Sequence, residues 1–129
     1  MVQRVTGIGG IFIKAKDPDA LRAWYRDRLG IPVESWGGCA FNWSVPGRPE
    51  PDGGVTAWSV FSDDPKNFAP STARFMVNYR VADLHALLAA LRAEGCAVDD
   101  KVDESEYGKF GWVMDPEGNR VELWEPPAA

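Results

Sequence analysis

Two segments of the chain repeat one order of apolar and polar positions. β-Branched and aromatic residues dominate residues 8–15 and 73–81, and this composition predicts two strands. An aspartate follows each strand, and the carboxylates of Asp17 and Asp83 can accept hydrogen bonds from the first free amides of a helix. Pro18 then stands at a first helical position, where its missing N–H costs nothing. The pattern predicts a strand followed by a helix in each half.

The segments after these aspartates have the apolar spacing of amphipathic helices. In the second segment, leucines recur at positions i, i+3, i+4 and i+7, which places them on one face. The first segment repeats this stripe, and Gly30 and Gly95 supply the left-handed residue that ends each helix. Such helices must lie on one face of a sheet, which leaves the other face for a different role. The stripes consist of Leu21, Trp24, Tyr25 and Leu29 in the first helix and Leu84, Leu87, Leu88 and Leu91 in the second.

The two halves of the sequence align with each other. At an offset of 66 residues Asp17 falls on Asp83, and Val-Thr-Ala-Trp at residues 55–58 falls on Val-Glu-Leu-Trp at residues 121–124. The matches keep the same order along both halves, which indicates a duplicated unit.

This repeat predicts a single α+β domain made of two modules. The modules cover residues 1–62 and 71–129, and residues 63–70 form the linker between them. Each module runs strand, helix and then about three strands. The total length of 129 residues fits one domain, because domains usually hold roughly 100–200 residues.

Side-chain alternation along the predicted strands separates two faces of the sheet. In the last strand Val121 and Leu123 suit the helix-covered side, so Glu122 points to the opposite face. Mixed aromatic, basic and amide residues on one face are typical of a pocket lining, and we predict a cavity there. In the alternative interpretation this face is exposed to water, and Lys14 or Arg80 pairs with Glu122. The residues assigned to the face of Glu122 are Gly10, Phe12, Lys14, Thr56, Trp58, Met76, Asn78, Arg80 and Trp124.

Composition and charge narrow the classes of function. The chain is 45% hydrophobic and 26% charged, which is typical of a globular protein, and its net charge is −5. Excess negative charge repels phosphate backbones, so we expect no nucleic-acid partner. No apolar run approaches the roughly 20 residues of a membrane span, and no export signal opens the chain. We therefore expect a cytoplasmic protein with Cys39 and Cys96 reduced.

Other motifs do not indicate nucleophilic catalysis or nucleotide binding. The single histidine, His85, lies beside the leucine stripe near a helix start, where a solvated position is expected. A serine or cysteine nucleophile needs an adjacent base, usually a histidine, and His85 is badly placed for that. The glycines at residues 7–10 do not form a dinucleotide-binding loop, because Phe12 stands where the third glycine belongs and no helix follows.

Several local motifs resemble the vicinal oxygen chelate superfamily of glyoxalases, bleomycin-resistance proteins and extradiol dioxygenases. They are Asp-Pro at residues 17–18, Trp-Tyr-Arg at 24–26, Leu-Gly-Ile at 29–31 and Asp-Pro-Glu-Gly-Asn-Arg-Val-Glu-Leu-Trp-Glu-Pro at 115–126. The resemblance implies tandem βαβββ modules whose sheet curls into a half-open barrel around a cavity. It also implies a homodimer, since many relatives complete the cavity across subunits.

The resemblance further implies four positions that hold a divalent metal in the enzymes of the superfamily. They fall on Gly10, Thr56, Met76 and Glu122 of this chain. Glu122 alone is a good ligand, because Gly10 has no side chain and the thioether of Met76 is unsuited to metals that prefer oxygen donors. We therefore expect no metal and no other cofactor.

Three functions remain open at this point. In the first, the chain binds a small, partly aromatic or hydrophobic molecule without a metal. Phe12, Trp58 and Trp124 would then offer stacking faces, while Lys14, Met76, Asn78 and Arg80 complete the ligand-binding residues. In the second, the chain is a lyase, isomerase or dioxygenase that acts on a small carbonyl compound, with Glu122 as catalytic base or metal ligand. In the third, the fold serves only to join subunits in a dimer.

Overall fold

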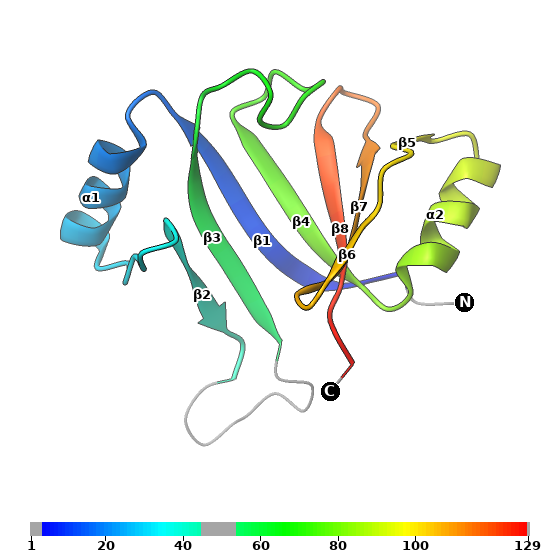
Figure 1. The fold of residues 1–129 in the computed structure, drawn as a ribbon, viewed down its shortest axis with the longest axis horizontal. Helices are drawn as coiled ribbons and strands as arrows, with labels where there is room; N and C mark the ends of the chain where they lie inside the picture. Colours follow the sequence, from blue (N-terminus) through cyan, green and yellow to red (C-terminus); the bar gives the residue numbers. More distant parts are fainter. Residues whose placement is uncertain (1–3, 45–53, 129) are drawn as a thin grey trace.

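The computed structural model describes residues 4–44 and 54–128, which form two helices and one mixed sheet (Figure 1). The first half holds β1 (Val5–Ala15), α1 (Pro18–Leu29), β2 (Gly38–Asn42) and β3 (Val55–Ser62). The second half holds β4 (Phe75–Val81), α2 (Leu84–Ala93), β5 (Ala97–Val98), β6 (Asp103–Ser105), β7 (Gly108–Met114) and β8 (Arg120–Glu125). This is the predicted α+β fold.

The strands follow the order β2-β3-β1-β4-β8-β7-β5, and β6 pairs with β7. Antiparallel pairing of β1 with β4 joins the two halves, and each of these strands pairs in parallel with the last strand of its own half. At the centre Ile11 pairs with Val77, which is its counterpart at the 66-residue offset. The halves are therefore related by an approximate two-fold axis at this pair. The division into two modules at residues 63–70 remains a prediction.

Both helices begin at the predicted caps. The Asp17 carboxylate accepts a hydrogen bond from the Ala20 amide at 3.1 Å, and the Asp83 carboxylate accepts one from the Ala86 amide at 3.1 Å. Gly30 ends α1 with a φ of 70°, a left-handed conformation that glycine adopts without steric cost.

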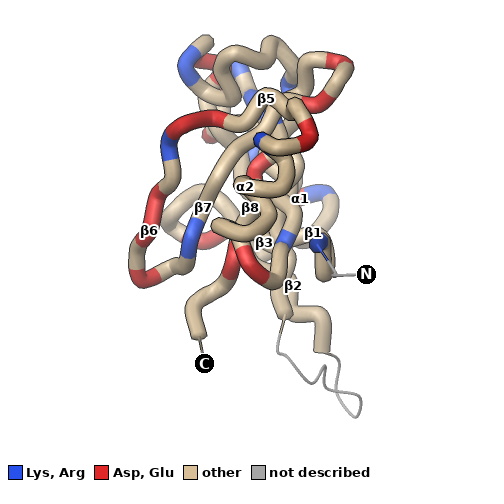
Figure 2. The backbone as a smooth tube through the Cα atoms, turned by 90° about the vertical axis from the view of Figure 1, so that its right-hand side faces the viewer, with Lys and Arg blue, Asp and Glu red and all other residues tan. Residues whose placement is uncertain are grey.

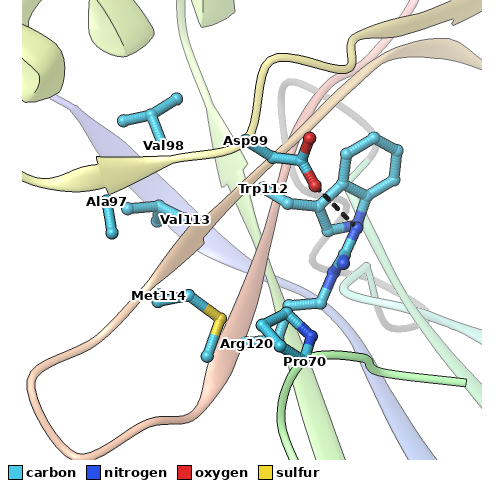
Figure 3. Close-up of a pocket in the computed structure, with 8 residues that line it drawn as sticks. All are labelled: Pro70, Ala97, Val98, Asp99, Trp112, Val113, Met114 and Arg120. Carbon is cyan, nitrogen blue, oxygen red and sulfur yellow. Dashed lines mark ion pairs between the residues drawn. The ribbon is translucent and has the colours of Figure 1, made fainter. Parts of the chain in front are cut away.

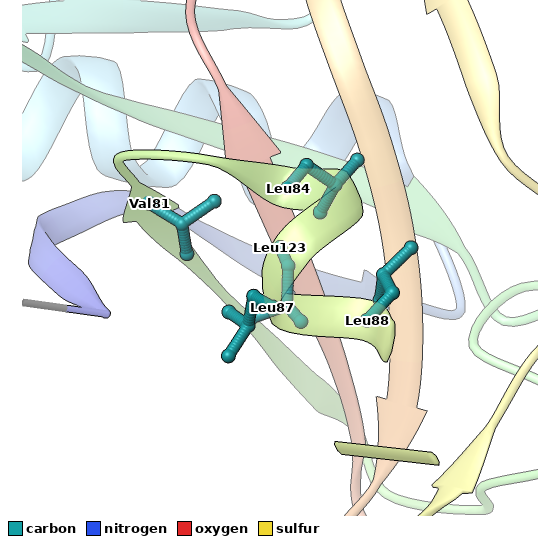
Figure 4. Close-up of a cluster of buried hydrophobic side chains, with 5 residues drawn as sticks. All are labelled: Val81, Leu84, Leu87, Leu88 and Leu123. Carbon is teal, nitrogen blue, oxygen red and sulfur yellow. The ribbon is translucent and has the colours of Figure 1, made fainter. Parts of the chain in front are cut away.

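The helices lie at the two ends of the sheet and pack on the same face of it (Figure 1). On α2, Leu84, Leu87 and Leu88 are buried against Val81 and Leu123 (Figure 4). A second buried cluster lies between α1 and β3 and consists of Ala15, Cys39, Trp58 and Val60. We call the opposite side of the sheet the inner face. Within the described ranges, no helix is long and apolar enough to cross a membrane.

Candidate functional site

Strand register places most of the predicted site residues together on the inner face. Asn78 pairs with Glu122 and Arg80 with Trp124, while the intervening Leu123 is buried against α2 on the other face. The pairing of Phe12 with Met76 and of β7 with β8 extends the same surface. Of the residues predicted from alternation, Phe12, Lys14, Met76, Asn78, Arg80, Glu122 and Trp124 lie on the inner face, which Phe110, Trp112 and Arg120 complete.

The predicted placement of Trp58 on this face is wrong. Trp58 pairs with Ile11 and lies against α1, where its ring centroid is 5.0 Å from that of Tyr25. In β3 it is Ser59 that stands opposite Phe12, as Glu122 stands opposite Asn78 in the other half. The 66-residue alignment is therefore displaced by three residues at β3. An odd displacement moves every side chain of a strand to the other face.

The same displacement corrects the position predicted for Thr56. Ser59, rather than Thr56, occupies the place that corresponds to Glu122. The Thr56 hydroxyl accepts a hydrogen bond from Trp43 Nε1 at 2.8 Å and donates one to the Ile8 carbonyl at 2.5 Å. Thr56 therefore supports the bulged part of β1.

Glu122 lies at the polar centre of the inner face. Asn78 Nδ2 donates a hydrogen bond to its Oε2 at 2.7 Å, and Trp112 Nε1 donates one to its Oε1 at 3.1 Å. Burial raises the pKa of Glu122 above the usual glutamate value, although these two hydrogen bonds and the nearby Arg120 oppose the shift. Glu122 thus accepts its hydrogen bonds from two neutral donors.

The side-chain amide of Asn78 has a buried oxygen without a hydrogen-bond donor among the described residues. Its Oδ1 is buried and accepts no hydrogen bond within the part of the chain that the structure describes. A Cβ atom at Gly9 would lie 2.3 Å from this oxygen, so a glycine is needed there to let the amide pack. A buried acceptor without a donor costs about 1–3 kcal/mol. Such a cost is more typical of a functional site than of a stabilising core.

Aromatic side chains cover much of the inner face. Phe68, Met76 and Trp112 are buried together, and Phe12, Phe61 and Phe110 pack against them. Phe68 comes from the predicted linker and has a φ of 68°, which is unusual for a residue with a side chain. The Lys14 ammonium lies 5.2 Å from the Phe68 ring centroid. Sequence reasoning missed Phe68, because it assigned residues 63–70 to a linker and no repeat partner or strand pattern marked this residue.

A pocket of about 230 Å³ opens beside this cluster, between the end of the linker and β7 (Figure 3). The Trp112 indole lines the pocket and also reaches Glu122, so it connects the opening with the polar centre. Hairpin geometry could have found Trp112, since the turn at residues 115–119 sets Trp112 opposite Glu122. The lining residues are Pro70, Ala97, Val98, Asp99, Trp112, Val113, Met114 and Arg120.

An acidic segment runs along the edge of the second half. Asp and Glu follow one another along β6 and the segments on either side of it (Figure 2). His85 is exposed, as predicted, and its Nε2 lies 2.9 Å from Glu104 Oε1. Neither residue lines the pocket beside Trp112.

The donors on the inner face do not fit a divalent metal. The positions that correspond to the ligands of the superfamily hold Gly10, Ser59, Met76 and Glu122, and a glycine and a buried thioether supply no hard donor. Within residues 4–44 and 54–128, no three His, Cys, Asp or Glu residues come together as a metal-binding group. The two oxygens of Glu122 are already engaged by Asn78 and Trp112.

The raised pKa of Glu122 predicts a pH-dependent stability. The folded protein keeps the Glu122 proton at pH values where the unfolded chain has lost it, so the free energy of unfolding falls as pH rises from the usual glutamate range through the raised pKa. Glu122→Gln removes this titration and should remove that fall. Urea unfolding of both proteins between about pH 4 and pH 8 measures the difference. Parallel stability curves for the two proteins would show that Glu122 titrates normally.

Comparisons with known proteins place the chain in the vicinal oxygen chelate superfamily. Within it, the chain belongs to the glyoxalase-like domain family, whose sequence profile matches residues 10–124. None of the curated protein sequences matches the chain.

Solved structures show the same fold. Methylmalonyl-CoA epimerase from Mycobacterium tuberculosis is 21% identical with a TM-score of 0.67, over 99% of this chain and 93% of the epimerase. A Streptomyces coelicolor methylmalonyl-CoA epimerase variant in complex with 2-nitronate-propionyl-CoA is 21% identical with a TM-score of 0.69, over 96% of this chain and 99% of the epimerase. A glyoxalase/bleomycin resistance protein/dioxygenase superfamily member from Vibrio splendidus 12B01 is 12% identical with a TM-score of 0.57, over 92% of this chain and 97% of that protein.

Proposed function

We propose that the chain binds a small, partly aromatic or hydrophobic molecule at the inner face without a metal ion. The observation that carries this proposal is the double role of Trp112, which lines the 230 Å³ pocket and donates a hydrogen bond to the buried Glu122. A ligand in the pocket therefore lies against an aromatic wall beside a carboxyl group of raised pKa. Mostly apolar walls with a few polar groups are typical of small-molecule sites.

The proposed ligand-binding residues differ in how they contribute. Trp112, Met114 and Arg120 line the pocket directly. Phe12 and Met76 support Trp112 from the aromatic cluster, and Asn78 holds Glu122 in place.

Lys14, Arg80 and Trp124 lie farther from the pocket. The Lys14 ammonium faces Phe68, and the Arg80 guanidinium lies 5.5 Å from the Trp43 ring centroid. Trp124 stacks with Phe110, and the two ring centroids are 6.3 Å apart. We propose that these three residues shape the inner face around the ligand.

Binding should survive removal of metal ions. Protein dialysed against a chelator should show the same change of tryptophan fluorescence with a panel of small aromatic compounds as untreated protein, because the described residues of the inner face offer no hard donor set for a metal. Elemental analysis of the purified protein serves as the control. A stoichiometric divalent metal, or binding that returns only when a metal is added, would contradict metal-free binding. Failure of every compound to change the fluorescence would count against ligand binding itself.

Catalysis by Glu122 is the second candidate function. Its support is the raised pKa, which brings a carboxylate closer to the basicity that a general base needs near neutral pH. The epimerase structures with this fold include a complex with 2-nitronate-propionyl-CoA, an acyl-CoA compound. A substrate of this class would be a small carbonyl compound that loses a proton to Glu122. Unchanged turnover in Glu122→Gln, with any substrate that the wild type converts, would remove this role.

We also propose that a second copy of the chain covers the helix face between α1 and α2. Phe75 pairs with Ile13, which packs on α1, so both side chains lie on that face. Phe75 is nevertheless 58% exposed and Ile11 38% exposed, although both stand on central strands. Central apolar residues of this kind are typical of association surfaces.

A charge at this strip should separate the proposed dimer. Phe75→Glu would place a carboxylate in the apolar contact, so light scattering after size-exclusion chromatography should report a monomer where the wild type gives a dimer. Glu106→Gln is the matched exposed control and should leave the mass unchanged. A monomeric wild type would contradict the proposal.

A further inference from the structure

The geometry of the pocket beside Trp112 points to a carboxylate-bearing ligand whose anionic group is held by Arg120. This inference rests on the proposed function and names the class of ligand: a small hydrophobic carboxylic acid. Three features of the described residues carry it: the unused donors of Arg120, the cations that lie on the Trp112 ring, and the size and apolar character of the remaining wall.

Arg120 has more hydrogen-bond donors than the protein uses. A guanidinium carries five N–H groups, and one of them, on Nη1, donates to the carbonyl oxygen of Ala69. Nη2 approaches Asp99 Oδ2 to 3.5 Å, which is longer than the usual 2.7–3.2 Å of an N–H···O hydrogen bond. No other acceptor for Arg120 is found in the described part of the chain. The side chain lines the pocket beside Trp112 and is only 18% exposed, so its remaining donors have little access to water (Figure 3).

Two cations lie over the Trp112 ring, and the Lys101 ammonium also pairs with Asp103 at 3.7 Å. The Arg120 guanidinium lies 5.0 Å and the Lys101 ammonium 5.6 Å from the ring centroid. Asp99 forms an ion pair with Arg120, and its Oδ1 already accepts a hydrogen bond from the Lys101 backbone amide at 2.9 Å. A guanidinium carries parallel N–H groups that match the two oxygens of a carboxylate.

The rest of the wall is apolar and sets the size of the ligand. Val98, Val113 and Met114 form it with Pro70 and Ala97. An apolar cavity of about 150 Å³ accepts benzene, so the 230 Å³ here accommodates a substituted aromatic ring or a branched acyl group. Lys14 and Arg80, the cations predicted among the ligand-binding residues, do not line this pocket. The anionic subsite is at Arg120 instead.

The test compares an acid with its neutral amide. Calorimetric titration at about pH 7 uses 4-tert-butylbenzoate and 4-tert-butylbenzamide, which share one apolar body and differ in charge. The acid should bind at least about tenfold more tightly, since a hydrogen bond to a charged group is worth about 1.5–3 kcal/mol. Arg120→Gln should abolish the preference, and Arg120→Lys should keep part of it. Asp99→Asn should increase it, because a competing acid is removed. Arg28→Gln, on the exposed side of α1, is the matched control and should change nothing.

The outcomes distinguish failure of the carboxylate subsite from failure of the proposed binding function. Equal affinity for acid and amide, unaffected by Arg120→Gln, would overturn the carboxylate subsite and leave the proposed binding function intact. Failure of both compounds to bind at millimolar concentration would overturn the subsite and count against the proposed function. If Arg120→Gln fails to fold, the acid-to-amide ratios of Arg120→Lys and Asp99→Asn decide, and ratios equal to the wild type would contradict the inference.

Discussion

Replacing Trp112 by alanine should lower the free energy of unfolding by about 3–5 kcal/mol and abolish ligand binding at the inner face. The indole is buried with Phe68 and Met76, so its removal leaves a large cavity in the aromatic cluster. The same change removes the pocket wall and the hydrogen bond that Nε1 donates to Glu122. Urea unfolding and titration with 4-tert-butylbenzoate measure the two effects.

Trp112→Phe separates packing from hydrogen bonding at this position. A smaller aromatic ring still fills much of the space and the donor is lost, so a loss of about 1–2 kcal/mol is expected. Because a hydrogen bond that lowers the pKa of Glu122 disappears, that pKa should rise further. Trp24→Ala is the control, since Trp24 is 51% exposed on α1, and its effect should stay within about 0.5 kcal/mol. If Trp112→Ala binds 4-tert-butylbenzoate like the wild type, Trp112 does not form the site.

Replacing Trp58 by alanine should cost as much stability as Trp112→Ala without the specific loss of binding. Trp58 is buried against Tyr25 and Val60 beneath α1, and we expect a loss of about 3–5 kcal/mol in the free energy of unfolding. Its indole lies on the opposite face of the sheet from Glu122, so the ligand does not touch it. Unfolding by urea and the affinity for 4-tert-butylbenzoate are the two measurements.

A milder variant keeps the Trp58 prediction testable if the alanine variant unfolds. Trp58→Phe fills most of the space against Tyr25 and should fold, with an affinity for 4-tert-butylbenzoate equal to the wild type. A tenfold loss of affinity in folded Trp58→Phe would show that Trp58 belongs to the binding site, as alternation along the sequence had predicted.

The fold could be predicted from the sequence because short-range signals define it. Asp17 and Asp83 mark the helix starts, and the leucine stripe of α2 forms one of the two helix-face clusters. The inner-face position of Glu122 followed from its alternation with Val121 and Leu123. These features depend on residues that are neighbours along the chain or share one strand.

The site was only partly predictable, because it depends on register and on a loop. The pairing of β3 with β1 displaces β3 by three residues from the position that the 66-residue repeat predicts. This displacement places Ser59 on the inner face and Trp58 on the helix face. Phe68 reaches the inner face through a left-handed backbone conformation that its residue type does not favour. Arg120 gains its role from its contacts with Trp112 and with the Ala69 carbonyl of the linker. Ala69 lies 51 residues earlier in the chain, so no local pattern indicates this contact.

The most direct test of the account follows the indole N–H signals of Trp112 and Trp58 by nuclear magnetic resonance. Chelator-treated protein is titrated with 4-tert-butylbenzoate, and each signal is assigned with its phenylalanine variant. The Trp112 signal should shift to saturation while the Trp58 signal stays in place, since Trp112 lines the pocket and Trp58 lies beneath α1. A fixed Trp112 signal, or one that shifts only after a divalent metal is added, would contradict this expectation.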